Sequence, residues 1–587
     1  MDLDRREWWV NIYFWHSLRG VLQPVSPIVK NPGEQVRHRL IQGIDAELRP
    51  LTDTHKRWGY GGWLVVIAAF AVLHALNLRA DFPNHSPWTF DWAKYTDEGW
   101  YGNAAIRAHL FGNWYVPGDF NPAVALPVLP FLEWLLFFVT GVTPEAARGL
   151  AVAFFFANLL LSYWLLRAHG PRWAGLLAVT LIVTNPFLYC FSRLAILEPM
   201  LTAFTLGAMN LAVRLPRMRR PLAASVGIGL LLTLMMLSKS TAVFLLPAVG
   251  WALLLELRRD LKLALRCAAL ALGTFALSYG LWIGLLVHKG LMGDYRYLFF
   301  VNEYPKPKEL YWPLVSAIWS FHGGLWADHI LMPLAGVMVV VAVAIWWRTG
   351  GRKLLLDPVF GASACAVAGY VFFMTIQNHP QPRYFAVVAF FSFILLARGA
   401  EAMVSLAAAE PFRDLPEAHF AGWGVIGLAV VAAGINGART ADYAAHPQYS
   451  FVNAADQLVH YMDSHPNGNR LLLSISGDQI SLASHVSALC DDFVTPSPGI
   501  PDLPSKTAVY QPGWYAAWND LDPGTLQDLH VHYSLEQVAM FSAFDDTERN
   551  TLVLFKLHPL AGGEVRDPIG AGMQDELPGD SFEVPVE

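Results

Sequence analysis

The stretch RLPRMRRPLAASVGIGLLLTLMMLSKSTAVFLLPAVGWALLLELRRDLKLALR, residues 214–266, indicates the fold class of the chain. Two apolar runs, 222–237 and 241–255, are joined by a short polar turn that contains Lys239, and basic residues flank the pair on both sides. As helices, runs of this length nearly cross a hydrocarbon core of about 30 Å. The stretch therefore predicts two membrane helices with their polar turn on one side and basic loops on the other.

The whole chain shares this character. Hydrophobic residues make up 54% of its 587 residues, charged residues make up 15%, and the mean hydropathy is +0.36. A soluble domain carries roughly 25% charged residues, so we predict an α-helical polytopic membrane protein. About 11 apolar runs, within a range of about 10 to 13, are long enough or nearly long enough to span. They lie at 61–78, 147–166, 173–190, 199–213, 222–237, 241–255, 266–287, 328–347, 355–376, 384–400 and 421–438.

The N-terminus and the cysteines exclude other classes. The segment MDLDRREWWV has no small-residue cleavage site, so residues 1–60 are expected to form a cytoplasmic or interfacial collar and not a signal peptide. The four cysteines contain no CxxC pair, and neither a zinc site nor a disulfide framework is indicated. These cysteines are Cys190, Cys267, Cys365 and Cys490.

Basic residues predict the orientation. They are frequent before the first span, which favours a cytoplasmic N-terminus. A further apolar run, 123–142, is interrupted by Glu133 and two prolines. If it does not span, the short basic loops near 167–172, 214–220, 258–266 and 348–353 all face the cytoplasm; if it spans, all of them face outside. We therefore predict a helix on or re-entering the outer leaflet, within a first outer loop at 79–146. A second outer loop is predicted at 288–327.

A change in charge marks a second domain. Residues 439–587 carry a net charge of −15, against +9 for residues 1–438. Long apolar runs also stop there, and RLLLSIS and NTLVLFKL are typical of strands, with FVNAADQLVHYM as an amphipathic helix before them. We expect a transmembrane domain at 61–438 and a small extracytoplasmic α/β domain at 439–587.

The predicted topology gathers unusual polar residues on the outer side. These residues are Asp97 and Glu98 in YTDEGWYGNAA, Arg193 and Glu198 in SRLAILEPM, Lys239 in LSKST, and His379 and Arg383 in QNHPQPRYF. Each of these residues alone can be explained by a structural role, because an acidic residue can begin a helix and a Lys or Arg can anchor the end of a span. Their joint occurrence at one surface, from spans far apart in the sequence, favours a functional site.

The order of these motifs resembles the GT-C membrane glycosyltransferases, especially the group containing protein O-mannosyltransferases and the aminoarabinose transferases that modify lipid A. Members carry an acidic pair followed by a Tyr in the first outer loop, matched here by Asp97, Glu98 and Tyr101. The segments SRLAILEPML, LSKSTAVFLLP and HPQPRYF match three later elements. The resemblance covers roughly residues 61–438. One element departs, because relatives often have a Lys-Pro pair where this chain has Asn121 and Pro122.

The resemblance implies a bacterial inner-membrane enzyme that inverts the sugar it transfers. Its donor is a polyprenyl-phosphate sugar, and its acceptor is a hydroxyl or phosphate on a lipid, glycan or protein at the outer face. Asp97, Glu98 and Glu198 are then the catalytic carboxylates, and the same three can also bind Mg²⁺ or Mn²⁺ as an optional cofactor.

Cations and aromatic residues complete the predicted site. Lys239, Arg383 and Arg193 are expected to bind the donor phosphate. The second outer loop adds Tyr304, Lys306, His322 and Trp326 as substrate contacts, with an interfacial aromatic belt as an equally open explanation. The remaining substrate contacts are Tyr101 and His379, and Lys306 or Lys308 can replace the missing lysine of the Lys-Pro pair.

Two other classes compete with an enzyme. A transporter or flippase of a lipid-linked substrate predicts charges near span centres and repeated halves, and the sequence shows neither. A scaffold whose acidic C-terminal domain binds partners leaves the four motifs unexplained. The partners expected are membrane lipids, the lipid-linked donor and the acceptor, with no nucleic acid. The sequence identifies neither the sugar nor the acceptor.

Overall fold

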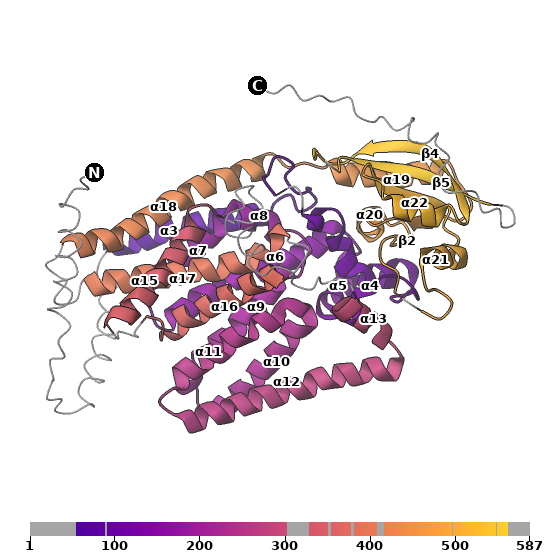
Figure 1. Cartoon of the computed structure of the whole chain (residues 1–587). Helices are drawn as coiled ribbons and strands as arrows, with labels where there is room; N and C mark the ends of the chain where they lie inside the picture. The colour runs from indigo at the N-terminus through magenta and orange to yellow at the C-terminus, as the bar shows by residue number, and fades with distance from the viewer. Residues whose placement is uncertain are drawn as a thin grey trace, which may run out of the picture.

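The computed structural model describes residues 54–88, 91–301, 328–349, 354–376, 381–407, 416–495, 497–547 and 549–560. Long helices form a bundle, and a small sheet with its own helices covers one end of it (Figure 1). Most of the predicted N-terminal collar lies outside the described residues. The same is true of five predicted substrate contacts, Tyr304, Lys306, His322, Trp326 and His379.

Helices lie at every apolar run that the sequence predicted as a span. They are α3 (Thr54–Ala75), α6 (Pro144–Arg167), α7 (Arg172–Val183), α8 (Pro186–Ser192), α9 (Glu198–Ala212), α10 (Pro221–Ser238), η5 (Ser240–Phe244), α11 (Leu246–Leu257), α12 (Leu261–Lys289), α15 (Leu331–Thr349), α16 (Pro358–Ile376), η7 (Pro382–Tyr384), α17 (Phe385–Ala407) and α18 (Pro416–Ala445). Among the described residues, seven helices are long and apolar enough to cross a membrane, or eight if the bent pair α7 and α8 is one span. The helical membrane fold is thus present, and the number of about 11 spans stays a prediction.

The run 173–190, which the sequence predicted as one span, forms two helices with a bend between them. The chain bends by 68° between α7 and α8. Pro186 begins α8, and its ring nitrogen carries no hydrogen with which to continue the hydrogen bonding of α7. The side chain of Asn185 caps the new helix instead, accepting a hydrogen bond from the amide of Leu188 at 3.0 Å.

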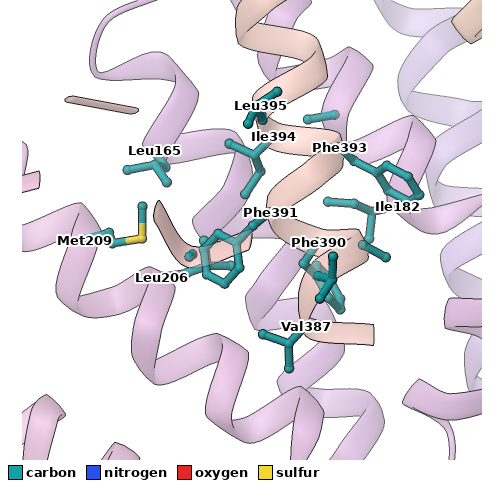
Figure 2. Packing of buried hydrophobic residues seen from close by; sticks show 14 of the residues in the cluster. Leu165, Ile182, Leu206, Met209, Val387, Phe390, Phe391, Phe393, Ile394 and Leu395 are labelled. Carbon is teal, nitrogen blue, oxygen red and sulfur yellow. The ribbon is translucent and has the colours of Figure 1, made fainter. Parts of the chain in front are cut away.

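Helix α17 forms the centre of the apolar core. Figure 2 shows its side chains packed among those of α6, α7 and α9, namely Val387, Phe390, Phe391, Phe393, Ile394 and Leu395 with Leu165, Ile182, Leu206 and Met209. In its span, 72% of the residues are buried, whereas only 11% are buried in the span of α12. Helix α12 therefore lies at the periphery of the bundle, with an apolar surface suited to lipid.

Four short elements connect α3 to α6. They are η2 (Trp92–Lys94), α4 (Asp97–Phe111), η3 (Pro122–Val124) and α5 (Val128–Thr140). Helix α5 has 13 residues, or about 20 Å, so it is too short to cross a core of about 30 Å. That 123–142 lies on or re-enters the outer leaflet stays a prediction. Helix α5 packs against α4, where Glu133 is buried beside Gly102.

The C-terminal residues form a mixed five-stranded sheet in the order β2-β1-β3-β5-β4. Its elements are α19 (Ser450–Ser464), β1 (Leu472–Leu473), α20 (Gly477–Ser484), β2 (Ala488–Leu489), α21 (Leu503–Tyr510), β3 (Trp514–Trp518), α22 (Pro523–Leu529), β4 (Tyr533–Ser542) and β5 (Thr551–Pro559). Strand β1 is parallel to β2 and β3, and β5 is antiparallel to β3 and β4. Helix α18 continues past the predicted boundary at 438/439 to Ala445.

The two ends of the helix bundle differ in the segments that lie there. Helices α4, α5 and α13 (Met292–Arg296) gather at the end where α20 and α21 lie (Figure 1). Basic turns meet one another at the other end. There Arg217 donates to the carbonyl oxygen of Ala168 at 3.0 Å, and Arg258 donates to that of Leu356 at 2.6 Å. These bonds join the turn between α9 and α10 to the one after α6, and the turn between α11 and α12 to the one before α16.

Candidate active site

Helix ends bring five charged side chains together beneath the C-terminal sheet. Asp97 lies in the first turn of α4, and Glu198 is the first residue of α9. Lys239 is the C-cap of α10, and Arg383 lies in η7 directly before α17. Asp91, the N-cap of η2, completes the set. We call these five residues the charged cluster.

Arg383 joins the carboxylates of the charged cluster. Its Nη1 lies 2.5 Å from Asp91 Oδ1, and its backbone N–H donates to Asp91 Oδ2 at 2.8 Å. Its Nη2 lies 2.7 Å from Asp97 Oδ2. Its Nε lies 3.9 Å from Glu198 Oε1. One guanidinium group therefore links η2, α4 and α9.

Lys239 forms the second cationic centre. Its ammonium group makes an ion pair with Glu198 Oε1. Its Nζ lies 4.7 Å from the ring centroid of Tyr384, and Cζ of Arg383 lies 5.2 Å from the same centroid. Because an aromatic face is electron-rich, Tyr384 stabilises both cations next to each other.

The charged cluster is buried, with no residue more than 5% exposed. Its three carboxylates face two cations, so its formal charge is −1. Burial raises the pKa of Asp97, and although Arg383 opposes this, Asp91 and Glu198 raise it further. Asp97 therefore takes up a proton at a higher pH than an ordinary aspartate, as a general base for a hydroxyl requires.

Two carboxylate oxygens of the charged cluster have no hydrogen-bond donor among the described residues. They are Asp97 Oδ2 and Glu198 Oε2. The contact of Arg383 with Asp97 Oδ2 is an ion pair without an aligned hydrogen bond, whereas Asp97 Oδ1 lies 3.1 Å from the hydroxyl of Thr96. Buried polar oxygens are rarely left in this state. These two are open to a donor from a ligand.

The carboxylate of Glu98 points away from the charged cluster, although the sequence grouped it with Asp97. Arg148 grips it with two hydrogen bonds, Nε to Oε1 and Nη2 to Oε2, both at 2.7 Å. The amide of Ala195 donates to Oε1, and Gln479 Nε2 donates to Oε2, both at 2.9 Å. Successive helical residues point about 100° apart, which separates the two neighbours.

Two other predicted site residues lie in different places. Arg193 donates to the carbonyl oxygens of Leu76 and Asn77, at 2.5 and 2.7 Å, so it closes the end of α3 and does not enter the charged cluster. Tyr101 lies one turn after Asp97 on α4. Burial, and then the charge of Asp97, raise the pKa of Tyr101 well above its ordinary value, so its hydroxyl stays protonated next to the carboxylate.

The sequence reasoning missed Asp91, Tyr384 and Arg148. Asp91 stands six residues before Asp97 in a segment where an aspartate commonly begins a turn, and nothing there indicated a long-range partner. Tyr384 follows Arg383 within a motif that was recognised only for its charges. Arg148 stands near the start of an apolar run, where it was indistinguishable from an anchor of the span.

A metal site was predicted at Asp97, Glu98 and Glu198. Throughout the residues that the structure describes, no three Asp, Glu, His or Cys side chains converge in a way that would hold a metal ion. The predicted set is divided, because Glu98 binds Arg148 while the other two face Arg383 and Lys239. The predicted Mg²⁺ or Mn²⁺ site does not fit these residues as they lie.

Comparisons with known proteins agree with this architecture. Residues 121–282, which include Glu198 and Lys239, match the family model of dolichyl-phosphate-mannose-protein mannosyltransferase. ArnT from Cupriavidus metallidurans, solved with undecaprenyl phosphate, is similar over 84% of this chain and 98% of that chain, at 15% identity and a TM-score of 0.55. Residues 121–282 thus resemble this family in sequence, and most of the chain resembles ArnT in fold. The resemblance to GT-C glycosyltransferases that the motifs predicted is thus confirmed, over residues 121–282 in sequence and over most of the chain in fold.

Two further solved structures are less similar to this chain. The archaeal oligosaccharyltransferase AglB from Archaeoglobus fulgidus has a TM-score of 0.48 at 13% identity, over 81% of this chain and 72% of that chain. The arabinofuranosyltransferase AftD from Mycobacteria has a TM-score of 0.47 at 13% identity, over 86% of this chain and 40% of that chain. No curated protein matches the chain in sequence.

Proposed function

We propose that this protein is a GT-C glycosyltransferase and that it moves a sugar from a polyprenyl-phosphate donor to an acceptor on a lipid, glycan or protein at the outer face of the membrane. The open oxygens of Asp97 and Glu198, lying beside Lys239 and Arg383, carry the proposal. An acceptor hydroxyl needs a base, and a departing lipid phosphate needs positive charge. The charged cluster offers both within one buried site.

In the proposed step, Asp97 takes the proton of the acceptor hydroxyl as the acceptor oxygen bonds to the anomeric carbon. The bond between that carbon and the phosphate oxygen breaks, and its electron pair leaves with the lipid phosphate. Lys239 and Arg383 stabilise the charge that develops there, the arginine with a forked geometry suited to phosphate oxygens. A single displacement inverts the anomeric carbon and needs no covalent enzyme intermediate.

The other residues hold these groups in place. Asp91 fixes Arg383 through both its guanidinium group and its backbone, and Glu198 fixes Lys239. Glu98 ties α4 to α6 through Arg148 and is a positioning residue in this proposal. Arg193 has no part in transfer, because its hydrogen bonds close the end of α3.

The lipid part of the donor fits the periphery of the bundle. ArnT, which shares the fold, is solved with undecaprenyl phosphate. The long helix α12 exposes several leucines that lipid chains can contact, namely Leu265, Leu272, Leu277, Leu281 and Leu285. We therefore take undecaprenyl phosphate as the probe for the donor site.

Orientation follows from the basic turns. Because cytoplasmic loops carry an excess of Lys and Arg, the end with Arg217 and Arg258 belongs in the cytoplasm and the charged cluster outside. We expect Asn113→Cys and Thr140→Cys, both at exposed positions, to react with an impermeant thiol reagent in intact cells. Arg219→Cys should react only in opened membranes. The reverse labelling would contradict an outer site.

The transfer itself can be tested without knowing the sugar. Purified protein is incubated with a panel of polyprenyl-phosphate sugars, and mass spectrometry records which donor is consumed and whether polyprenyl phosphate is released. We expect one donor to be consumed by the wild type and spared by Asp97→Asn. Equal consumption by both proteins, or consumption of no donor, would count against the proposal.

A further inference from the structure

Helix α4, which carries Asp97, begins without a cap from its own segment of chain. The side chain of its N-cap residue, Thr96, accepts no hydrogen bond from a backbone amide of the first turn. The Thr96 hydroxyl lies instead 3.1 Å from Asp97 Oδ1 and 3.3 Å from the carbonyl oxygen of Trp92. The first amides of a helix have no partner within it, so acceptors must come from elsewhere.

Gln479, the third residue of α20 in the C-terminal sheet region, supplies such an acceptor. Its Oε1 accepts a hydrogen bond from the amide of Gly99 at 3.3 Å. Its Nε2 donates to Glu98 Oε2 at 2.9 Å and to the carbonyl oxygen of Lys94 at 3.5 Å. The side chain is 3% exposed. One buried amide group thus holds the turn before α4 and the first turn of α4 from 380 residues away.

The backbones of α4 and α20 approach each other unusually closely at this point. A Cβ at Gly99 would lie 2.1 Å from the backbone nitrogen of Gln479 and 2.2 Å from the backbone carbon of Asp478. Only a glycine allows such an approach. Trp100 Nε1 also donates to the carbonyl oxygen of Ile475 at 3.0 Å.

The same face of α4 continues the contact. Asn103 and Arg107 follow Gly99 at intervals of four residues, and both donate to the carboxylate of Asp478, at 3.1 and 2.9 Å. Asp97, on another face, points to the charged cluster. The C-terminal region therefore holds one side of α4 while another side presents the carboxylate.

We propose that Gln479 is a positioning residue that caps α4 from a distant segment of the same chain. Through this cap, the C-terminal domain sets the position of Asp97. The inference rests on the proposed function for the role of Asp97, but the cap itself is a separate statement about α4. Loss of the cap frees the first turn, and misplacement of a base by about 1 Å can cost up to about 10²-fold in rate.

The test compares Gln479→Met with Tyr510→Phe. Methionine fills a similar volume without either hydrogen bond, which preserves packing. Tyr510 donates to the carbonyl oxygen of Pro117 at 2.7 Å, so Tyr510→Phe removes a different contact between the C-terminal region and the segment after α4. Hydrogen exchange of a peptide covering residues 95–101, the Kd for undecaprenyl phosphate and kcat are measured in both variants.

We expect Gln479→Met to exchange faster at Gly99 and to lose about 10-fold or more in kcat. Its Kd for undecaprenyl phosphate should stay at the wild-type value, and its unfolding temperature should match that of Tyr510→Phe. Gln479→Asn, which draws the amide back by one carbon, should give intermediate exchange. This second variant keeps the cap testable if Gln479→Met does not fold.

Unchanged exchange in Gln479→Met, or equal loss of kcat in Tyr510→Phe, would overturn the inference. The proposed function fails by a different result, namely wild-type turnover in Asp97→Asn. In that case faster exchange in Gln479→Met would still support the cap, because exchange does not depend on transfer.

Discussion

Asp97 and Glu98 are adjacent and almost equally buried, at 2% and 1% exposure, yet their surroundings differ. Glu98 accepts hydrogen bonds at both oxygens, from Arg148, the amide of Ala195 and Gln479. Asp97 Oδ2 accepts none from the described residues. A buried carboxylate whose two oxygens both accept hydrogen bonds from the protein holds the fold together, and we call it a framework carboxylate. A buried carboxylate with an oxygen that accepts none can accept a hydrogen bond from a substrate.

A second framework carboxylate extends the contrast. Asp119 accepts hydrogen bonds from Arg107 at 2.6 Å, from Lys506 at 2.5 Å and from the amide of Cys490 at 3.0 Å. Burial raises its pKa, but Lys506 and Arg107 outweigh burial and hold it below the ordinary value. The pKa of Asp97 moves in the opposite direction. The cations beside Asp119 thus keep this carboxylate ionised, whereas burial keeps Asp97 able to take a proton.

The largest effect is expected at Asp97. Asp97→Asn keeps the size of the side chain but removes the proton acceptor, so turnover should fall by about 10² or more, the usual scale for a general base. The Kd for undecaprenyl phosphate and the unfolding temperature should stay close to wild type. Turnover is measured on the donor identified in the panel experiment.

Glu198 is the alternative base, because its Oε2 is also open. Glu198→Gln should mainly disturb Lys239 and therefore donor binding. If Asp97→Asn turns over normally while Glu198→Gln is inactive, the base is misassigned. If both variants remain active on the true substrate pair, neither Asp97 nor Glu198 is the base.

The next effect is on stability and concerns Glu98. Glu98→Gln leaves the guanidinium group of Arg148 buried without its countercharge, which costs about 3–5 kcal/mol when one partner of a buried pair is removed. The unfolding temperature in detergent should fall by several degrees, and the double variant with Arg148→Met should recover part of the loss. Asp97→Asn is the matched control.

A stable Glu98→Gln that loses turnover as strongly as Asp97→Asn would reverse the assignment. In that case both carboxylates would belong to the chemistry, despite the difference in their hydrogen bonds.

Smaller losses are expected for the cations. Lys239→Ala and Arg383→Ala each remove a charge that faces the donor phosphate, so each should weaken binding of undecaprenyl phosphate by about 10-fold, a difference of about 1.4 kcal/mol. Arg193→Ala is the matched control, since Arg193 closes α3 instead. If all three variants bind undecaprenyl phosphate with equal affinity, Lys239 and Arg383 stabilise the fold and do not bind the donor phosphate.

The sequence predicted the membrane fold and most of the charged cluster for physical reasons. Apolar runs reveal helices directly, and Lys239 and Arg383 stand out because charge at a span end is costly. The break in 173–190 was readable from Asn185 and Pro186, but a high overall hydropathy concealed it.

The remaining features depend on contacts between distant segments. Nothing in the sequence shows that Glu98 faces Arg148, because the direction of a side chain follows from where the helix packs. The contact of Gln479 with α4 could not be predicted for the same reason, since it depends on the close approach of α20 to Gly99. Asp91 resembles any turn residue until Arg383 is placed beside it.

One further carboxylate tests whether an open oxygen alone indicates function. Asp491 Oδ1 also accepts no hydrogen bond from the described residues, yet Asp491 lies in the C-terminal region, directly after strand β2 and far along the chain from the charged cluster. Burial, and then the neighbouring Asp492, raise the pKa of Asp491 to about 7. We expect it to be satisfied by protonation and not by a ligand.

The smallest predicted effect follows from this pKa. The folded value of about 7 lies above an unfolded value of about 4, so stability is highest at low pH and is lost as pH rises through 7, by at most about 1.4 kcal/mol per pH unit. The unfolding temperature should therefore fall as the pH rises towards about 7 and level off above it, and Asp491→Asn should reduce this dependence. Asp545→Asn, at an exposed position, is the matched control. If Asp491→Asn has the same slope as wild type, Asp491 is ionised in the folded protein and its open oxygen needs another explanation.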